Sequence, residues 1–393
     1  MSTSTAVERT HATRWRDRLR DRWYAWRDRI LTDPQFHRLA IRSWWLRPVA
    51  RRRARGLFDV VSGFVYSQIL LACVRLRVVD QVSQGPQTLT ELARHMELSC
   101  VAAQRLLDAA VALQLLEHRG TWQGEPRYGL GILGAPLVGN EAVLALIEHH
   151  AILYDDLRDP VTLLKGGGPT PGLQRYWAYA TEPTPGTLSE DRVQDYCALM
   201  SASQPLVAQE VLDAYCVASH RCLMDVGGGQ GRFAAAAAAR APSLQVQVFD
   251  LPKVVPAAAQ YLTSLGLAHR SQVLGGDFTR DELPRGADVI SLIRVLYDHG
   301  DERVLTLLKK VFDALPPGGT VLVAEPMAGA RGAARMGDAY FGFYLLAMGS
   351  GRPRSAAQLA QLLHTTGFHQ VQERPTPIPL QVGVLVARKP FPN

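Results

Sequence analysis

The sequence predicts a two-domain α/β protein, with a Rossmann-like sheet flanked by helices in its C-terminal half and a mostly helical, winged-helix-like domain in its N-terminal half. Three observations predict this fold. An apolar strand at 222–226 leads into a glycine-rich turn and an alanine-rich helix. Two further strands end near acidic residues, Asp250 and Asp277. Residues 88–128 carry two helical patterns followed by a strand pair with glycine turns.

Length and composition fit this organisation. A chain of 393 residues, 47% apolar and 20% charged, can form two domains and an extension. Its five cysteines form no C-x-x-C pair, which argues against a disulfide framework and a structural metal site. The first residues lack the apolar core of a secretory signal, so we expect a cytoplasmic protein.

Residues 1–56 form a basic, tryptophan-rich extension. They hold 15 Arg and five acidic residues, a net charge of +10, whereas the rest of the chain carries −3. Five of the seven tryptophans lie here, and Trp15, Trp23 and Trp26 fall in one narrow arc of a helix. This pattern is typical of a helix at the cytoplasmic face of an anionic membrane; docking on a protein surface is the alternative.

A second helix is expected after the Asp-Pro pair at 33–34. It brings Trp44 and Trp45 and closes on the arginine cluster at 51–55. The apolar stretch 57–74 follows, and its interrupting polar residues favour a long buried helix over a membrane span.

Residues 57–139 are assigned to the winged-helix-like domain. Two helices meet near Leu98-Ser99, with Thr90 as the expected cap of the first, and a strand pair spans 118–128. This outline also occurs in DNA-binding regulators. The second helix offers only Arg105 as a cation, so we expect no nucleic-acid binding, and a cofactor-sensing regulator stays an alternative.

Residues 140–215 are expected to form a helical connector that lines a substrate pocket. Helices are predicted at 140–165 and 189–215, with loops at 166–169 and 183–186 between them. Residues 216–393 then form the sheet domain.

The glycine-rich turn indicates which nucleotide binds. The run from Asp225 to Gly231 reads D-x-G-x-G-x-G, whereas the dinucleotide pattern G-x-G-x-x-G would need glycine at Arg232. Asp250, nineteen residues past Gly231, can accept the ribose hydroxyls of an adenine nucleoside. Asp277, followed by an aromatic residue, can bind and pack against adenine. This spacing indicates S-adenosylmethionine.

The C-terminal runs resemble those of the plant-type and acetylserotonin-type O-methyltransferase family. The matching runs are LMDVGGGQG (223–231), FDLPKVV (249–255), GGDF (275–278), RVLYDHGDE (294–302), PPGGTVLVAEPM (316–327) and TTGF (365–368). The resemblance implies an S-adenosylmethionine-dependent O-methyltransferase that releases S-adenosylhomocysteine, uses no metal, and forms a homodimer through its N-terminal half. The cofactor-binding residues that it implies are Gly227, Gly228, Gly229, Gly231, Asp250, Leu251, Asp277 and Phe278.

The catalytic segment departs from the family. Many members use a His as general base, and that position is Tyr297 here, while His299 stands where they have Trp. One of two flanking glutamates is kept as Glu325. We therefore expect His299, Tyr297 and Glu325 to be catalytic, with Glu325 orienting His299, and Asp298 to support the loop.

Within the family, the arginine-rich start and the RVLYDH run resemble the hydroxyneurosporene or demethylspheroidene O-methyltransferases of bacterial carotenoid synthesis. This implies methylation of a tertiary hydroxyl on a hydroxycarotenoid; an aromatic or polyketide phenol is the alternative acceptor. The family resemblance implies five residues in the acceptor pocket: Tyr196, Met200, Phe341, Tyr344 and Met348.

Overall fold

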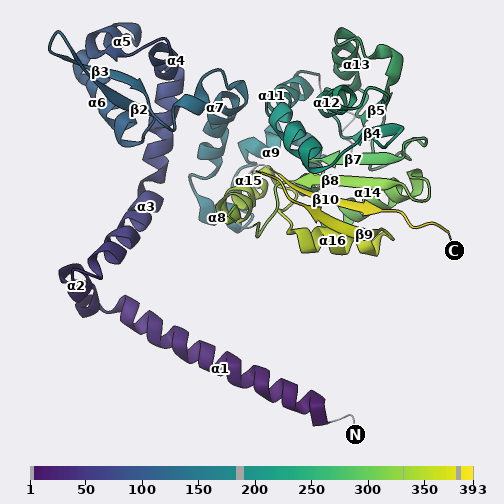
Figure 1. Ribbon diagram of the computed structural model, residues 1–393, viewed down its shortest axis with the longest axis horizontal. Helices are drawn as coiled ribbons and strands as arrows, with labels where there is room; N and C mark the ends of the chain where they lie inside the picture. The colour runs from purple at the N-terminus through teal and green to yellow at the C-terminus, as the bar shows by residue number, and fades with distance from the viewer. Residues whose placement is uncertain (1–3, 183–189, 331, 378–381, 393) are drawn as a thin grey trace. The chain divides into compact units, whose positions relative to one another are not determined.

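The computed structural model describes residues 4–182, 190–330, 332–377 and 382–392, without the side chains of 4–14, 16, 181, 190–198 and 202. The chain divides into two compact units, Met1–Ala135 and Pro136–Asn393. The first is purple to blue in Figure 1 and the second runs from teal to yellow.

Three helices open the first unit: α1 (Ser4–Thr32), α2 (Pro34–Arg42) and α3 (Arg47–Arg75). The expected break is confirmed, because the Asp33 carboxylate caps α2 by accepting from the Gln35 amide at 2.8 Å. The placement of Trp44 and Trp45 in the second helix is wrong. They lie in the turn before α3, because α2 ends at Arg42.

The apolar helix α3 is not buried as expected. Only Leu71 and Cys73 are buried along it, whereas Phe58 is 62% exposed and Phe64 is 68% exposed. The expectation of a buried helix is therefore wrong for a single chain. Over the described residues, α3 is the one helix long and apolar enough to cross a membrane, by length and composition alone.

The rest of the first unit is a helix pair against a small sheet. Its elements are α4 (Val78–Ser83), β1 (Gln87–Thr88), α5 (Leu89–His95), α6 (Cys100–Ala112), β2 (Leu116–Trp122) and β3 (Glu125–Leu130), and the strand order is β1-β3-β2. Thr88, not Thr90, caps α5, in a capping box with Glu91. Thr90 instead donates to the Glu125 carboxylate at 2.8 Å.

The second unit begins with helices: α7 (Glu141–Asp156), α8 (Pro160–Leu164), α9 (Gly172–Tyr176), α10 (Ala178–Thr181) and α11 (Glu190–Ala214). The first expected helix is shorter than predicted. It stops at Asp156, whose carboxylate accepts from the amides of Gly172 and Leu173 and so fixes the start of α9. The expected loop at 183–186 lies outside the described residues.

A seven-stranded sheet forms the centre of this unit. Its strands are β4 (Cys222–Val226), β5 (Gln245–Asp250), β6 (Ser271–Gly275), β7 (Val289–Ile293), β8 (Thr320–Glu325), β9 (His369–Arg374) and β10 (Gly383–Arg388). The order is β6-β5-β4-β7-β8-β10-β9, with β10 antiparallel to both neighbours and the first five strands parallel. The predicted fold class is confirmed.

The apolar faces of α12 (Arg232–Arg240), α13 (Val255–Ser264), α14 (Asp301–Ala314) and α16 (Ala356–Thr365) pack against the sheet. Helix α15 (Phe341–Met348) packs against α7, α8 and α9. The chain runs outward from β4 through β5 to β6 and then returns to β7 on the other side of β4. Such a reversal leaves a crevice at the carboxyl ends of the strands, where α/β proteins bind ligands.

Candidate active site

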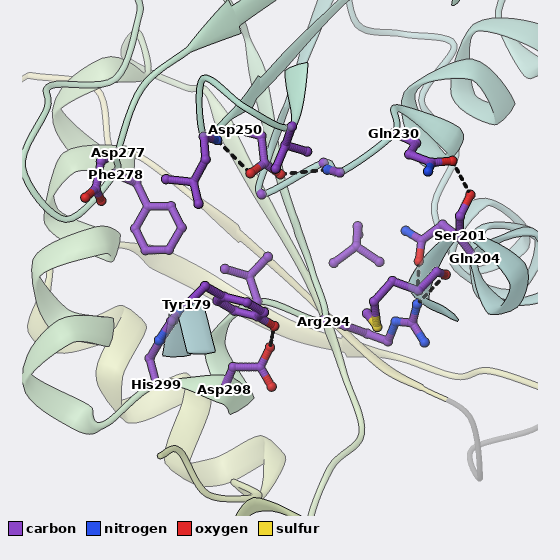
Figure 2. A pocket seen from close by; sticks show the side chains of 18 of the residues that line it. Tyr179, Ser201, Gln204, Gln230, Asp250, Asp277, Phe278, Arg294, Asp298 and His299 are labelled. Atoms are coloured by element: carbon purple, nitrogen blue, oxygen red, sulfur yellow. Dashed lines mark hydrogen bonds between the residues drawn. The ribbon is translucent and has the colours of Figure 1, made fainter. Parts of the chain in front are cut away.

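A cavity opens at this reversal, with about 930 Å³ of empty space when the open solvent at its mouth is included. Figure 2 shows its wall. The lining residues come from the loops after β4, β5, β6 and β7 and from α10 and α11. Seven of the eight expected cofactor-binding residues are among them: Gly227, Gly228, Gly229, Asp250, Leu251, Asp277 and Phe278.

The glycine loop after β4 leaves room for a ligand. Gly229 has a φ of 55°, and a β carbon there would meet nothing within 4 Å, so its face is open. Gly227 has a φ of 68°, and its β carbon would lie 2.8 Å from a methyl of Val295. Gly231 is not among the residues lining the cavity. It precedes α12 and faces the core near Val248, so it shapes the turn.

Asp250 ends β5 at the cavity wall. Its two carboxylate oxygens accept from the amides of Gly229 and Leu251, each at 2.7 Å (Figure 2). Burial raises the pKa of this carboxyl, and the two amides partly offset the shift. Each oxygen keeps a second lone pair, so the carboxylate can still accept from the hydroxyls of a ribose.

Asp277 and Phe278 follow β6 on the adjoining wall. The Asp277 carboxylate accepts from the amide and hydroxyl of Thr279, at 2.8 and 2.6 Å. The Phe278 ring meets His299 edge to face, with centroids 5.5 Å apart. An apolar ring beside a fixed carboxylate suits a purine.

The lining residues that were not foreseen from the sequence include Tyr179, Ser201, Gln230 and Arg303. Ser201 donates to the Gln230 side chain at 2.8 Å, and Arg303 donates to the carbonyl of Ala180 at 3.0 Å. These four residues come from segments far apart in the chain. No sequence motif marks Tyr179, Ser201 or Arg303, which lie on helices.

Arg294 lines the cavity at the end of β7 and is directed toward α11. Its guanidinium donates to Ser203 and Gln204 on α11, at 2.9 and 2.8 Å, and to the carbonyl of Met200. Its φ of 58° directs the chain out of β7 at this point. Arg294 therefore ties the loop to α11.

The loop after β7 carries the expected catalytic residues. His299 is 3% exposed and lines the cavity, between the rings of Phe278 and Tyr179. Burial, with Arg303 and Arg354 nearby, lowers the pKa of His299 to about 3. The imidazole is therefore neutral at physiological pH, and it is a weak base.

Tyr297 and Glu325 lie behind the cavity and are not among its lining residues. Tyr297 packs against Phe341 with centroids 5.9 Å apart, and burial raises the pKa of its hydroxyl. Glu325 accepts from the amides of Val295 and Leu296, at 3.1 and 2.7 Å, and burial raises its pKa to about 8.

The expectation that Glu325 orients His299 is wrong. Its Oε1 holds the loop backbone, and over the described residues neither its Oε2 nor the Nδ1 of His299 has a hydrogen-bond partner.

The sequence predicts that Asp298 supports the loop, whereas its side chain lines the cavity. Asp298 is 3% exposed, and its Oδ2 accepts from the Tyr179 hydroxyl at 2.7 Å (Figure 2). Burial raises the pKa of Asp298 to about 7. The loop itself is held by its backbone, since Ser350 donates to the Asp298 carbonyl.

The expected acceptor residues divide into three groups. Met200 lines the cavity. The side chain of Tyr196 lies outside the described residues. Phe341, Tyr344 and Met348 are not among the lining residues and belong to a packed cluster in which the Tyr344 hydroxyl accepts from Trp177 at 2.7 Å. Their contact with an acceptor stays a prediction.

Comparison with known proteins is consistent with this geometry. Residues 172–369 match the O-methyltransferase domain, and residues 58–139 match the O-methyltransferase dimerisation domain. Demethylspheroidene O-methyltransferase of Cereibacter sphaeroides is 43% identical over 362 residues, which cover 92% of this chain and 94% of that protein. The chain belongs to the O-methyltransferase family.

Other members of this O-methyltransferase family are more distant. Acetylserotonin O-methyltransferase of Mus musculus is 32% identical over 82% of this chain and 86% of its own. The structure of human N-acetylserotonin methyltransferase in complex with S-adenosylmethionine is 26% identical, with a TM-score of 0.68 over 86% of this chain and 98% of that one.

The cofactor of this O-methyltransferase is S-adenosylmethionine, and the residues present fit it. The open face of Gly229 would hold its methionine part, Asp250 its ribose, and Asp277 with Phe278 its adenine. When bound, it supplies a methyl group on a sulfonium. Over the described residues, no cluster of His, Cys, Asp and Glu could hold a metal ion.

Proposed function

We propose that this O-methyltransferase methylates a tertiary hydroxyl of a hydroxycarotenoid such as hydroxyneurosporene or demethylspheroidene. The observation that carries the proposal is the 43% identity with demethylspheroidene O-methyltransferase over nearly the whole of both chains. The acetylserotonin enzyme of the mouse is 32% identical over a smaller share. The lining of the cavity includes the apolar side chains of Met200, Val254 and Ile293, which suit a hydrocarbon acceptor.

Acceptor comparison tests this proposal. The full-length enzyme is incubated with methyl-labelled S-adenosylmethionine and a detergent-solubilised hydroxycarotenoid, N-acetylserotonin or a polyketide phenol. We expect label in the carotenoid at a kcat/KM at least tenfold above that for either phenolic acceptor. Turnover of phenols alone would assign the enzyme to the phenolic class.

We also propose that the enzyme is a homodimer. The segment matching the dimerisation domain includes the exposed apolar face of α3, with Phe58, Val61 and Phe64. Side chains of this kind are rarely left in water over several turns of a helix. Sedimentation should give twice the chain mass, and Phe64→Asp should give monomer; Val101→Asp, at an exposed position on α6, is the control.

We further propose that residues 1–56 hold the enzyme on the cytoplasmic face of an anionic membrane, where so apolar an acceptor would reside. Trp15, Trp23 and Trp26 are 62%, 53% and 59% exposed on α1, and the segment carries a net charge of +10. Interfacial helices combine these two features.

Vesicle binding tests the membrane proposal with the full-length protein. We expect sedimentation with vesicles containing anionic lipid, weaker binding to neutral vesicles, and loss of binding when Trp15, Trp23 and Trp26 are all replaced by Ser. Trp122→Ser changes an equally exposed tryptophan outside the segment and is the control. Equal binding by the triple variant and the wild type would contradict the anchor.

A further inference from the structure

We propose that Asp298 is the general base of this methyltransferase and that Tyr179 positions its carboxylate. The inference rests on transfer to a hydroxyl group, as in the proposed function, but not on which hydroxyl compound is the acceptor. The observation that supports it is the contact between Asp298 and Tyr179. A buried carboxylate and a tyrosine hydroxyl lie 2.7 Å apart on the wall of the cavity that holds the glycine loop (Figure 2).

The other candidate bases are weaker or occupied. Tyr297 lies behind the cavity wall, and burial raises the pKa of its hydroxyl, so it holds its proton. His299 faces the cavity, but burial lowers its pKa to about 3. Glu325 is engaged by the amides of the loop.

Three carboxylates line the cavity: Asp250, Asp277 and Asp298. Asp250 accepts from the amides of Gly229 and Leu251, and Asp277 accepts from the amide of Thr279, so both are held by backbone on the side assigned to the nucleoside. Asp298 comes from the loop after β7 and faces Tyr179 on α10. It is thus the carboxylate placed to meet a second substrate.

The loop around Asp298 is held on several sides, so the carboxylate is preorganised. Ser350 donates to the Asp298 carbonyl at 2.9 Å, and the amide of Arg352 donates to the Tyr297 carbonyl at 3.0 Å. The buried Arg354 donates to the carbonyl of His299 at 2.7 Å. Fixed geometry of this kind lowers the cost of placing donor and acceptor in line.

The proton transfer is coupled to methyl transfer. The acceptor oxygen forms its bond to the methyl carbon while the carbon–sulfur bond of the cofactor breaks, and the electron pair of that bond stays on sulfur. The hydroxyl proton passes to the Asp298 carboxylate and leaves to water after the product is released. A general base of this kind contributes about 10²- to 10⁴-fold to the rate.

The electrostatic surroundings suit this role. Burial raises the pKa of Asp298 to about 7, so its carboxylate is a stronger base than an exposed aspartate. Arg294 is the nearby cation, and its charge opposes the shift. The other titratable groups that interact with Asp298 electrostatically are Tyr297, Glu325 and Tyr344.

The first test is Asp298→Asn, assayed with the acceptor that the wild type turns over best, so that a wrong acceptor class leaves this test intact. The amide oxygen can still accept from Tyr179, but the side chain cannot take a proton. We expect kcat to fall at least about 10²-fold. The affinity for S-adenosylhomocysteine, measured by calorimetry, should change by less than threefold.

The pH dependence of kcat separates a base from a structural residue. Wild-type kcat should rise with pH to a plateau above about 7, because the carboxylate must be ionised. The residual activity of Asp298→Asn should lack this rise. Tyr179→Phe removes the hydrogen bond that lowers the pKa of Asp298, so the rise should move to higher pH and kcat should fall about tenfold.

Two controls match these changes. Tyr215→Phe removes another tyrosine hydroxyl, one bound to His220 at 2.7 Å, and Asp213→Asn removes a surface carboxylate paired with Arg240. Both should keep wild-type kcat and its pH profile. The proposal is overturned if Asp298→Asn keeps a tenth of wild-type kcat, or loses cofactor affinity in proportion. It is equally overturned if Tyr179→Phe, which keeps the carboxylate, leaves the pH profile in place.

Discussion

Two loops at the carboxyl edge of the sheet build the two sides of the cavity by different means. The loop after β4 is held by the next strand of the chain, since the Gly229 amide donates to Asp250 at the end of β5. The loop after β7 is held by residues far along the chain. Glu325 on β8 binds two of its amides, and Arg354 binds two of its carbonyls, those of Leu296 and His299.

The difference shows why one loop keeps a motif and the other does not. The cofactor loop needs glycine at set positions because its own backbone makes the shape. The loop after β7 is held by Glu325 and Arg354. These backbone contacts do not involve the side chain of Tyr297, so they do not require the His that many family members have there. Removing one support from each loop tests this comparison.

The largest effect is expected from Arg354→Met. Arg354 is 2% exposed, and its loss leaves the carbonyls of Leu296 and His299 without their donor. We expect the free energy of unfolding in urea to fall by about 3 kcal/mol, and kcat to fall while the affinity for S-adenosylhomocysteine is kept. Arg352→Met is the control, because Arg352 makes only a partly exposed ion pair with Asp301 through its side chain. Equal losses in the two variants would contradict remote support of the loop.

Asp250→Ala should disrupt the loop after β4 and the binding of the cofactor product. Loss of the carboxylate frees the Gly229 amide and removes the acceptor for the ribose hydroxyls. Calorimetry should show binding of S-adenosylhomocysteine weakened about 100-fold, as for lost hydrogen bonds to a charged group. Asp213→Ala, a surface carboxylate, should bind normally. Unchanged affinity in Asp250→Ala would show that the ribose lies elsewhere.

The two glycines sharpen the comparison. Gly229→Ala meets no atom within 4 Å, so only its positive φ costs stability, about 1–2 kcal/mol. Gly227→Ala has the same unfavourable φ, and its β carbon would also lie too close to Val295 in the loop after β7. Gly227→Ala should therefore unfold at a lower urea concentration than Gly229→Ala, and its unfolding free energy should be lower by about 1 kcal/mol. Identical midpoints would mean that the two loops do not press on each other.

The smallest effect over any one pH unit is expected in the pH dependence of stability. Burial raises the pKa of Glu325 to about 8, so the folded state holds a proton that the unfolded chain loses near pH 4.5. Stability from this proton is present below pH 4.5 and is lost as pH rises through about 8. Glu325→Gln should therefore flatten the fall in unfolding free energy over this window, by about 1 kcal/mol per pH unit. Parallel curves for wild type and variant would contradict a protonated Glu325.

Much of the cofactor side could be predicted, because glycine spacing and strand-end acids report backbone needs directly. The sequence also predicted the class of the sheet and most of the elements around it. Some details were not predicted, because two neighbouring residues could each have filled the same role. Thr88 caps α5 because Glu91 completes the box, whereas Thr90 finds Glu125 on β3.

By itself, the sequence determined the fold class, the glycine-rich turn after the first strand of the sheet domain and the basic, tryptophan-bearing helix, since each depends on residues close together in the chain. Only the tertiary structure decided that Tyr179 meets Asp298, that Glu325 holds the loop and that the early part of α3 is uncovered in a single chain. Tyr179 and Asp298 are 119 residues apart, and Glu325 lies about 30 residues beyond the amides that it accepts from. Such contacts depend on how strands and helices pack, which residue spacing does not encode.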